Sequence, residues 1–331
     1  MNRIVHTLVT LIALTTATAF AEDLKFKLVP NYFDVKPGGQ DFGPHHGGII
    51  LDQAGNIYVS SDTPRGIDMY TSDGKFVKSL GPTRIHGMEM VSEKGEEFIY
   101  GARPSDHEVV KLKLDGTLVW AIHYPAEATS EVNGQPAPIY KEAKDFNPCA
   151  VTTGPDGSVF VADGYGKNYV LKFDANQKFV KAFGGPGSDQ GKFSTCHGIA
   201  LDDRQGKPLL LVCNRANRRV EYWDLDGNFV KVVQKELRLP SAVQIRGNFA
   251  VIAELEGRVV VLDKDGNIAS ILGDNPNTKQ RANYGVPPAE WTEGIFNAPH
   301  GASIDKQGNI LVTEWNKFGR VHKFVPATVA P

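Results

Sequence analysis

The sequence is poor in the features that would assign it to a specialised class of protein. Its three cysteines in 331 residues, Cys149, Cys196 and Cys213, are too few for a disulfide-dense scaffold. Cys149 and Cys196 could pair, but an odd count leaves at least one thiol over. The formal net charge is −2 and there is no Lys/Arg block, so the charge favours neither a nucleic-acid nor an anionic-membrane partner. Beyond the N-terminus, no apolar run approaches the roughly 20 residues that a membrane-spanning helix requires.

The N-terminus is the exception to the lack of apolar runs. MNRIVHTLVTLIALTTATAFA has a short positive start and an apolar stretch, and it ends in the small-x-small pattern Ala19-Phe20-Ala21. This is typical of a secretory signal peptide over residues 1–21, cleaved after Ala21. The alternative, an N-terminal membrane anchor, is disfavoured because the stretch is short and the cleavage pattern is good. We therefore expect an exported protein, periplasmic or secreted, that begins near Glu22.

Short apolar segments separated by turns make up most of the remaining chain. Glycine is abundant, with 34 residues, and Asp-Gly pairs recur at positions typical of turns between strands. No long stretch has a convincing helical period. One unit recurs six times, as in GGIILDQAGNIYVSSD and HGASIDKQGNILVTE, and each copy contains four short strands. The copies begin at Gly47, His86, Cys149, His197, Ser241 and His300.

Six copies of a four-stranded unit predict an all-β protein, a single six-bladed β-propeller over residues 22–331. A pair of β-sandwiches is the alternative, but the repetition of one unit favours the ring. Long segments near 125–146 and 273–297 interrupt the spacing and are expected to be surface loops that could form part of a binding mouth. Leu24 to Pro30 is an extra candidate strand, which would complete the last blade and close the ring.

Three histidines open alternate copies of the repeat. The loop that leads into the innermost strand of a propeller blade faces the central channel, so His86, His197 and His300 should approach one axis from three sides. Three converging imidazoles with an open position are what a catalytic zinc site requires. The alternative is that each histidine is a turn or packing residue, because the glycine that follows it also permits tight backbone curvature.

The other candidate ligands are weaker. His46 lies one position early in the repeat; it could line the same mouth but is not assigned as a ligand. His107, His123 and His322 are expected on outer strands or their turns. Cys149 occupies the same position in its copy of the repeat as the three histidines do in theirs. It could be an additional ligand or an inert buried thiol.

Beyond these patterns, the segment FGGPGSDQGKFSTCHGIALD resembles the NHL repeat. Over nearly its whole mature length the chain resembles the catalytic domain of peptidyl-α-hydroxyglycine α-amidating lyase. That family is a six-bladed propeller in which three histidines hold a zinc ion. It converts a C-terminal α-hydroxyglycine peptide into a peptide amide and glyoxylate. The resemblance implies the same reaction here, on a peptide or small-molecule substrate. Apart from the resemblance, we expect no nucleic-acid partner, no membrane association after signal cleavage, and a monomeric chain.

The resemblance also assigns residues. His86 in RIHGM, His197 in TCHGI and His300 in APHGA match the zinc ligands, Tyr165 in the D-G-Y motif matches the catalytic tyrosine, and Arg215 in VCNRANRRV matches an active-site arginine. A second arginine corresponds best to Arg65 in DTPRGID, an alignment that needs a gap, and Arg103 competes with it. A phenol near a cation is a credible base, and a guanidinium can hold a carboxylate through two hydrogen bonds.

The chain departs from the family at several positions. The acidic residue that helps to bind a structural calcium after the last zinc histidine is replaced by Gly301, which places calcium in doubt. Ala298 replaces a methionine, and Gly166 replaces a cysteine that would form a family disulfide. The copper monooxygenase domain of bifunctional members is absent. The alternatives to an amidating lyase are an exported non-catalytic NHL propeller that binds a peptide, glycan or protein, and a related zinc enzyme with another substrate.

Overall fold

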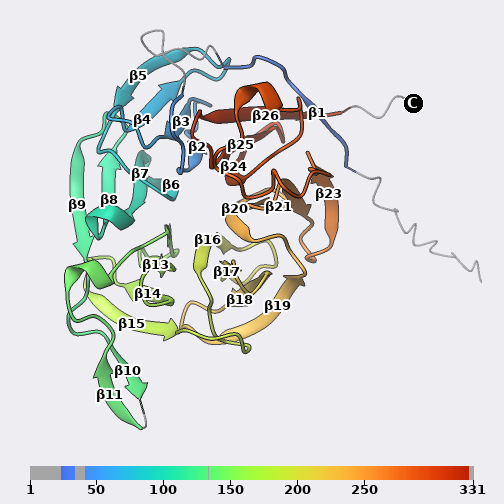
Figure 1. Ribbon diagram of the computed structural model, residues 1–331. Coiled ribbons are helices and arrows are strands. Elements are labelled where there is room, and N and C mark those ends of the chain that lie inside the picture. Colours follow the sequence, from blue (N-terminus) through green and yellow to red (C-terminus); the bar gives the residue numbers. More distant parts are fainter. Residues whose placement is uncertain (1–23, 34–41, 133, 328–331) are drawn as a thin grey trace, which may run out of the picture.

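A computed structural model describes residues 24–33, 42–132 and 134–327 of the protein. The proposed signal peptide lies outside the described residues. The described chain forms six four-stranded antiparallel sheets around a central axis, so the predicted all-β, six-bladed propeller is confirmed (Figure 1). Within the described part, no helix has the length and apolar character to cross a membrane.

The strands of each blade follow one another from the axis to the rim. The first blade contains β2 (Ile49–Leu51), β3 (Ile57–Ser60), β4 (Ile67–Tyr70) and β5 (Phe76–Leu80), and the second β6 (Met88–Glu93), β7 (Glu96–Arg103), β8 (Glu108–Lys113) and β9 (Leu118–His123). The third contains β12 (Ala150–Thr153), β13 (Val159–Asp163), β14 (Tyr169–Phe173) and β15 (Phe179–Gly184). The fourth contains β16 (Cys196–Asp202), β17 (Leu209–Asn214), β18 (Arg219–Trp223) and β19 (Phe229–Lys235), and the fifth β20 (Pro240–Arg246), β21 (Phe249–Glu254), β22 (Arg258–Leu262) and β23 (Ile268–Leu272).

The sixth blade joins the two ends of the chain. It contains β24 (Pro299–Ile304), β25 (Ile310–Glu314), β26 (Arg320–Pro326) and, as its outermost strand, β1 (Phe26–Leu28). β1 pairs antiparallel with β26 from Phe26 opposite Pro326 to Leu28 opposite Phe324. The extra strand predicted near the N-terminus is therefore present, and it closes the ring.

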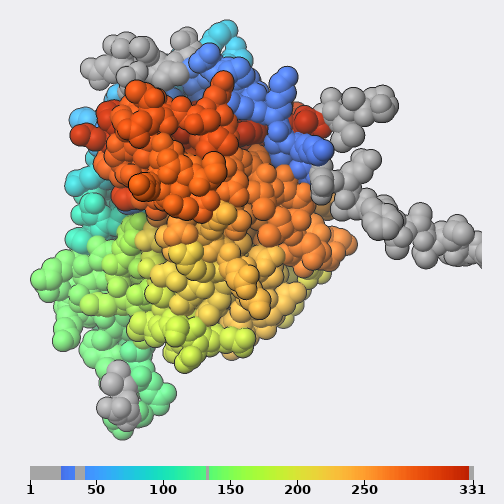
Figure 2. All heavy atoms as spheres, turned by 45° about the vertical axis from the view of Figure 1, so that its right-hand side comes forward, coloured from blue at the N-terminus to red at the C-terminus, as the bar shows by residue number. Residues whose placement is uncertain are grey.

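The two long interblade segments differ in structure. Residues 125–146 include the hairpin of β10 (Thr129–Val132) and β11 (Gln135–Pro138), which protrudes from the rim in Figures 1 and 2, and the 3-10 helix η3 (Ala143–Asp145). Residues 273–297 contain no described strand, only the 3-10 helix η4 (Pro288–Glu290). A third short helix, η2 (Pro104–Asp106), joins β7 to β8.

The glycine after each ring histidine allows neighbouring blades to approach closely at the axis. A Cβ on Gly87 would lie 2.4 Å from the carbonyl oxygen of Cys149, and one on Gly301 would lie 2.9 Å from that of Gly47. Real Cβ atoms do not come so near to backbone, and the backbone of the next blade has no room to withdraw. The His-Gly pairs therefore have a packing reason in addition to any chemical one. Farther from the axis, apolar side chains such as Val109, Val151 and Val161 fill the space between blades.

Polar residues at the end of the second strand fix the segments that lead into four of the blades. Asp163 accepts a hydrogen bond from the Asn147 backbone N–H (2.7 Å), and Glu254 accepts one from that of Arg238 (2.7 Å). Asn214 in the fourth blade and Glu314 in the sixth accept equivalent bonds. Each bond satisfies a backbone N–H that is at least partly buried, and it holds the chain just before the ring position.

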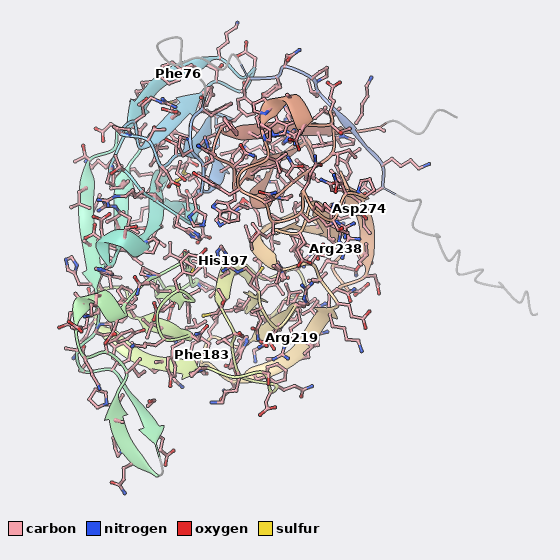
Figure 3. The ribbon with its side chains drawn as sticks, in the orientation of Figure 1. Phe76, Phe183, His197, Arg219, Arg238 and Asp274 are labelled. Atoms are coloured by element: carbon pink, nitrogen blue, oxygen red, sulfur yellow. The ribbon has the colours of Figure 1, made fainter. Side chains whose placement is uncertain are left out.

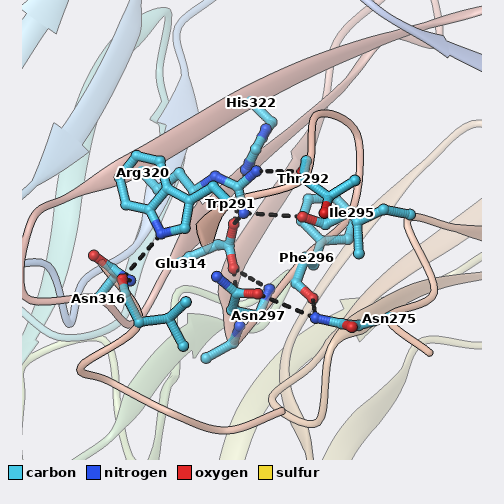
Figure 4. Close-up of polar contacts among 12 residues, drawn as sticks. Asn275, Trp291, Thr292, Ile295, Phe296, Asn297, Glu314, Asn316, Arg320 and His322 are labelled. Atoms are coloured by element: carbon cyan, nitrogen blue, oxygen red, sulfur yellow. Dashed lines mark hydrogen bonds and ion pairs between the residues drawn. The ribbon is translucent and has the colours of Figure 1, made fainter. Parts of the chain in front are cut away.

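Glu314 also anchors the long segment before the sixth blade (Figure 4). Its side chain accepts hydrogen bonds from the backbone N–H of Asn297 (2.5 Å), from Arg320 Nη1 (2.9 Å) and from His322 Nε2 (2.8 Å). Arg320 in turn donates to the carbonyl of Thr292 (2.8 Å). This buried network ties the end of the 273–297 segment to β25 and β26.

Candidate metal centre

The three predicted histidines meet at the axis of the ring. His86 lies just before β6, His197 is the second residue of β16 and His300 the second of β24; Figure 3 labels His197 near the centre of the molecule. The ring centroids are 4.7 Å apart for His86 and His197, 4.6 Å for His86 and His300, and 5.0 Å for His197 and His300. All three side chains are buried. The structure thus brings together the residues that the repeat placed at equivalent positions.

Each of these imidazoles is held by backbone of the adjoining blade. His86 Nδ1 donates to the Cys149 carbonyl (2.7 Å), His197 Nδ1 donates to the Ser241 carbonyl (2.5 Å), and His300 bonds to the Gly47 backbone. A carbonyl can only accept, so the proton is on Nδ1 and the lone pair is on Nε2. The Nε2 atoms of His86 and His300 are buried without a partner among the described residues. Buried, unpaired Nε2 atoms behind carbonyl-bound Nδ1 atoms are what a metal ion requires.

His46 is the functional candidate that sequence reasoning did not assign. The nitrogen atoms that His46, His86 and His300 offer to a metal all lie within 4.8 Å of one another. The His46 ring centroid is 4.7 Å from those of both His86 and His300. The repeat register gave no reason to choose it, because Gly47 holds the ring position of the first blade. The pair His45-His46 beside that position was the available signal.

Burial keeps the four imidazoles neutral. It lowers the pKa of His46 to about 4, with the positive charge of Arg215 acting in the same direction. The pKa values of His86, His197 and His300 are lowered well below 6.5, again chiefly by burial and further by Arg215 and neighbouring imidazoles. Neutral imidazole is the form that binds a metal, so the site can accept a cation at neutral pH without first losing protons.

Tyr165 and Arg215 lie together beside the histidines. The Tyr165 hydroxyl is 2.9 Å from His197 Nε2 and 3.3 Å from His46 Nε2, and Arg215 Nη1 donates to it at 3.1 Å. Burial raises the pKa of Tyr165 to about 12, the neighbouring Cys149 thiol acts in the same direction, and Arg215 opposes them. The phenol therefore needs a further positive charge nearby before it can serve as a base at neutral pH.

The loop that carries Tyr165 is fixed by Asp163. The Asp163 carboxyl accepts hydrogen bonds from the backbone N–H groups of Asn147 (2.7 Å) and Lys167 (2.8 Å) and from the Tyr140 hydroxyl (2.8 Å). Burial raises its pKa to about 7, against the effect of these bonds. Tyr140 belongs to the 125–146 segment, so that segment helps to hold the D-G-Y loop in place.

The other two predicted arginines contact carboxylates of their own blades. Arg65 Nε is 3.1 Å from the buried Asp68 carboxylate, and its Nη2 donates to the Phe42 carbonyl (2.7 Å). Arg103 pairs with Asp106 at 2.9 Å and with Glu108. Neither contact reaches Tyr165, whereas Arg215 does. A role for Arg65 in substrate binding stays a prediction.

Two cavities meet at His86. The channel behind the histidines has a volume of about 50 Å³ and includes Glu89 and Gln244 in its lining. It has room for a few water molecules but not for a substrate. A cavity of about 220 Å³ on the other side is lined by His46, Asp62, Arg84, His86, Pro104 and Ser105. We call this cavity the mouth, because it is the side from which a substrate has room to approach the histidines.

The remaining sequence expectations concern thiols and calcium. Cys149, Cys196 and Cys213 are buried and unpaired, so the possible Cys149–Cys196 disulfide is not formed. Burial raises the pKa of the Cys149 thiol to about 12, so the thiol stays protonated at neutral pH and is a poor nucleophile. Gly301 has no side chain to offer a cation; its backbone N–H donates to Thr313 Oγ1 (3.1 Å), and its carbonyl accepts from the same hydroxyl (3.5 Å).

Comparison with known proteins supports the fold. No family model matches the chain. Virginiamycin B lyase from Staphylococcus aureus has a TM-score of 0.58 and 14% identity, covering 92% of this chain and 100% of that chain. A catalytically inactive histidine-to-alanine variant of the same enzyme, with quinupristin, has a TM-score of 0.55 and 13% identity over 92% and 100%. A gluconolactonase from Xanthomonas campestris has a TM-score of 0.57 and 13% identity over 86% and 87%. These similarities establish the propeller fold that the chain shares with enzymes of different activity.

Proposed function

We propose that this protein is a zinc-dependent carbon–nitrogen lyase that resembles peptidylamidoglycolate lyase and cleaves a C-terminal α-hydroxyglycine-type substrate into an amide and glyoxylate. The observation that carries the proposal is the grouping of neutral imidazoles, two of which have Nε2 atoms unpartnered among the described residues (His86 and His300), beside the hydrogen-bonded pair of Tyr165 and Arg215. A scaffold that only binds a partner has no need for this combination.

The metal would be held by His86, His197 and His300, with His46 as a further ligand on the side of the mouth. Zn²⁺ accepts imidazole ligands in a tetrahedral arrangement and, when bound, supplies a Lewis acid that lowers the pKa of a hydroxyl group. The four imidazoles exceed what an open zinc site needs. His197 and His46 both contact the Tyr165 hydroxyl, so one of them can orient the tyrosine while the others bind the ion.

The chemical roles of the side chains follow from their positions. Tyr165 takes the proton of the substrate's α-hydroxyl group, and the O–H electron pair becomes the new carbonyl bond of glyoxylate. The C–N bond breaks, and the nitrogen leaves as the amide after it receives the proton that Tyr165 removed. Arg215 lies over the Tyr165 ring, 5.2 Å from its centroid, and can hold the substrate carboxylate while it favours the phenolate. Arg65 stays a proposed second carboxylate ligand.

The similar folds give this proposal general support, because one of those proteins is a lyase that loses activity when a histidine is replaced by alanine. We also propose that residues 1–21 direct export and that the mature protein acts as a monomer in the periplasm or outside the cell. Glyoxylate and an amide are the products that separate this function from lactone hydrolysis.

The first test is metal content. Purified wild-type protein should contain a near-stoichiometric amount of zinc, and the His197→Ala variant should contain much less. His123→Ala is the matched control because the His123 side chain is 67% exposed on the rim strand β9. Wild-type protein that neither retains nor takes up a metal would reject the lyase and leave a binding propeller.

The second test is the reaction. With α-hydroxyhippurate, wild-type protein should release glyoxylate, and Tyr165→Phe should lower the rate by about 10²- to 10⁴-fold while the metal stays bound. An unchanged rate in Tyr165→Phe would remove the tyrosine from the mechanism. Metal binding without glyoxylate would keep the site but reject this substrate.

A further inference from the structure

We infer that Trp315 and Tyr284 form an aromatic platform next to His46, beside the mouth, and that this platform selects substrates whose acyl group carries an aromatic ring. The inference rests on the proposed function, because it concerns the substrate of the same site. It concerns the acyl group, the part of the substrate that does not react, whereas the histidines and Tyr165 act on the reacting end.

The platform is connected to the metal centre through His46. The Trp315 ring centroid is 5.9 Å from that of His46, and the two planes are inclined by 41°. Tyr284 lies beyond Trp315, with centroids 5.1 Å apart and an angle of 35°. His46 in turn lies 6.2 Å from Tyr165. His46 therefore neighbours both Tyr165 and Trp315, so an acyl group that extends over His46 from a carbon reacting at Tyr165 would reach Trp315.

Both rings remain accessible to a ligand. Trp315 and Tyr284 are partly buried, unlike the fully buried aromatic residues of the core. Tyr284 is close enough to Asp62 for that carboxylate to raise the pKa of the phenol, although burial is the larger cause. Asp62 lines the mouth together with His46. Tyr284 therefore lies on the side of the molecule from which the substrate approaches.

Backbone contacts fix the platform before any ligand arrives. The backbone N–H of Trp315 donates to the carbonyl of Ala298 (2.8 Å). Ala298 lies two residues before His300, so the backbone of this tryptophan is held by the segment that leads into a metal-ligand candidate. The Lys317 N–H donates to the Tyr284 carbonyl (3.0 Å). Asn316 Nδ2 and Trp291 Nε1 both donate to the Val286 carbonyl, at 3.3 and 3.0 Å, and hold the adjacent loop (Figure 4).

A rigid pair of inclined aromatic rings favours a flat apolar group. Stacking of an aromatic ring adds to the gain from burying its area, and a preorganised surface avoids the loss of side-chain freedom on binding. A small acyl group such as acetyl offers no ring to stack on Trp315 or Tyr284. The geometry therefore predicts a preference for benzoyl-like or aromatic aminoacyl substrates over short aliphatic ones.

The test uses two ligands that bind without reacting. Hippurate (N-benzoylglycine) and N-acetylglycine lack the α-hydroxyl group and differ only in the acyl group. Calorimetric titration of metal-loaded wild-type protein should give a dissociation constant at least about tenfold lower for hippurate. Trp315→Ala and Tyr284→Ala should each reduce this preference, Trp315→Ala to less than about threefold. Trp315→Leu is the second variant if the alanine variant fails to fold.

Trp120→Ala provides the matched control. Trp120 is also partly buried, but it packs on Tyr100 in the second blade (5.2 Å between centroids), away from the mouth, and its removal should leave the preference unchanged. Equal affinities for the two ligands, failure to bind either one, or a preference that survives both Trp315 variants would overturn the platform.

The outcomes also separate this inference from the proposed reaction. A hippurate preference that depends on Trp315, without glyoxylate production from α-hydroxyhippurate, would reject the lyase and leave the platform. Glyoxylate production with no preference between benzoyl and acetyl ligands would retain the lyase and reject the platform.

Discussion

Metal uptake should release almost no protons from the histidines. A histidine with the usual pKa near 6.5 is half protonated at pH 6.5, so four such imidazoles together would release about two protons on binding a cation. In this protein the pKa of His46 is lowered to about 4, and those of His86, His197 and His300 are lowered well below 6.5. At pH 6.5 the protonated fraction of His46 is then about 0.3%. The four imidazoles should contribute close to zero protons.

Calorimetry measures this number directly. Zinc is titrated into the metal-free protein at pH 6.5 in buffers of different ionisation enthalpy, and the slope of the observed heat against that enthalpy gives the protons released. The Tyr165→Phe variant removes the other local source, the phenol. A proton that is released by wild type and not by this variant would come from Tyr165 and would support its role as a base.

One calorimetric outcome would contradict neutral histidines. Release of more than one proton that persists in Tyr165→Phe would mean that the histidines are protonated in the metal-free protein. Burial would then not keep them neutral, and the argument that the site is ready for a cation would be refuted.

Two further predictions concern stability. Burial lowers the pKa of His45 to about 4, so this side chain stays neutral in the folded protein below pH 6.5. The unfolded chain takes up a proton there, and the free energy of unfolding therefore falls as the pH drops from 6.5 toward 4. His45→Asn should therefore reduce the fall in unfolding free energy between pH 7.5 and 5.5 by about 1.3 kcal/mol, measured by urea unfolding with a chelator present; His123→Asn is the control, and an unchanged pH dependence in His45→Asn would contradict the assignment. Gly87→Ala would place a Cβ 2.4 Å from the Cys149 carbonyl oxygen that holds His86. This variant should lower the free energy of unfolding by about 1–3 kcal/mol, measured by thermal or urea unfolding, and it should lower the zinc content. Gly285→Ala is the control and should change neither quantity, because its Cβ would meet only the Asn283 side chain at 3.6 Å. Equal stability of the two glycine variants would show that the inner strands can move apart.

The repeat made the fold and the main histidines predictable. Because six copies share one pattern, a residue in one copy has an equivalent in every other, and His86, His197 and His300 could be placed around one axis before any coordinate was known. An extra candidate strand before the first copy, Leu24 to Pro30, could likewise be assigned to the closing of the last blade. The repeat can be recognised in the sequence alone, because its period does not depend on which side chains are in contact.

Features that depend on the loops were not predictable in the same way. His46 joins the site because the segment before the first blade brings it over the axis, where its ring lies 4.7 Å from two of the predicted ligands. Tyr284 and Trp315 meet because the 273–297 segment folds back against the sixth blade. Such contacts have no period, and their residues have no equivalents in the other copies. The choice among Arg65, Arg103 and Arg215 was likewise a matter of alignment, and the ion pairs of Arg65 and Arg103 are visible only in three dimensions.

The closing of the ring by β1 has a consequence for the order in which the protein is made. β1 is among the first described segments to be synthesised, yet its partner β26 lies near the opposite end, with Phe26 opposite Pro326. The sixth blade cannot be complete until nearly the whole chain has emerged, and contacts between distant residues form slowly. The nascent chain therefore keeps an open ring, with the inner strands of the first and sixth blades unable to meet, throughout translation. A chain in this condition has not yet brought His300, in β24, to His86 and His197, so the group of histidines would be complete only when the sixth blade joins the ring.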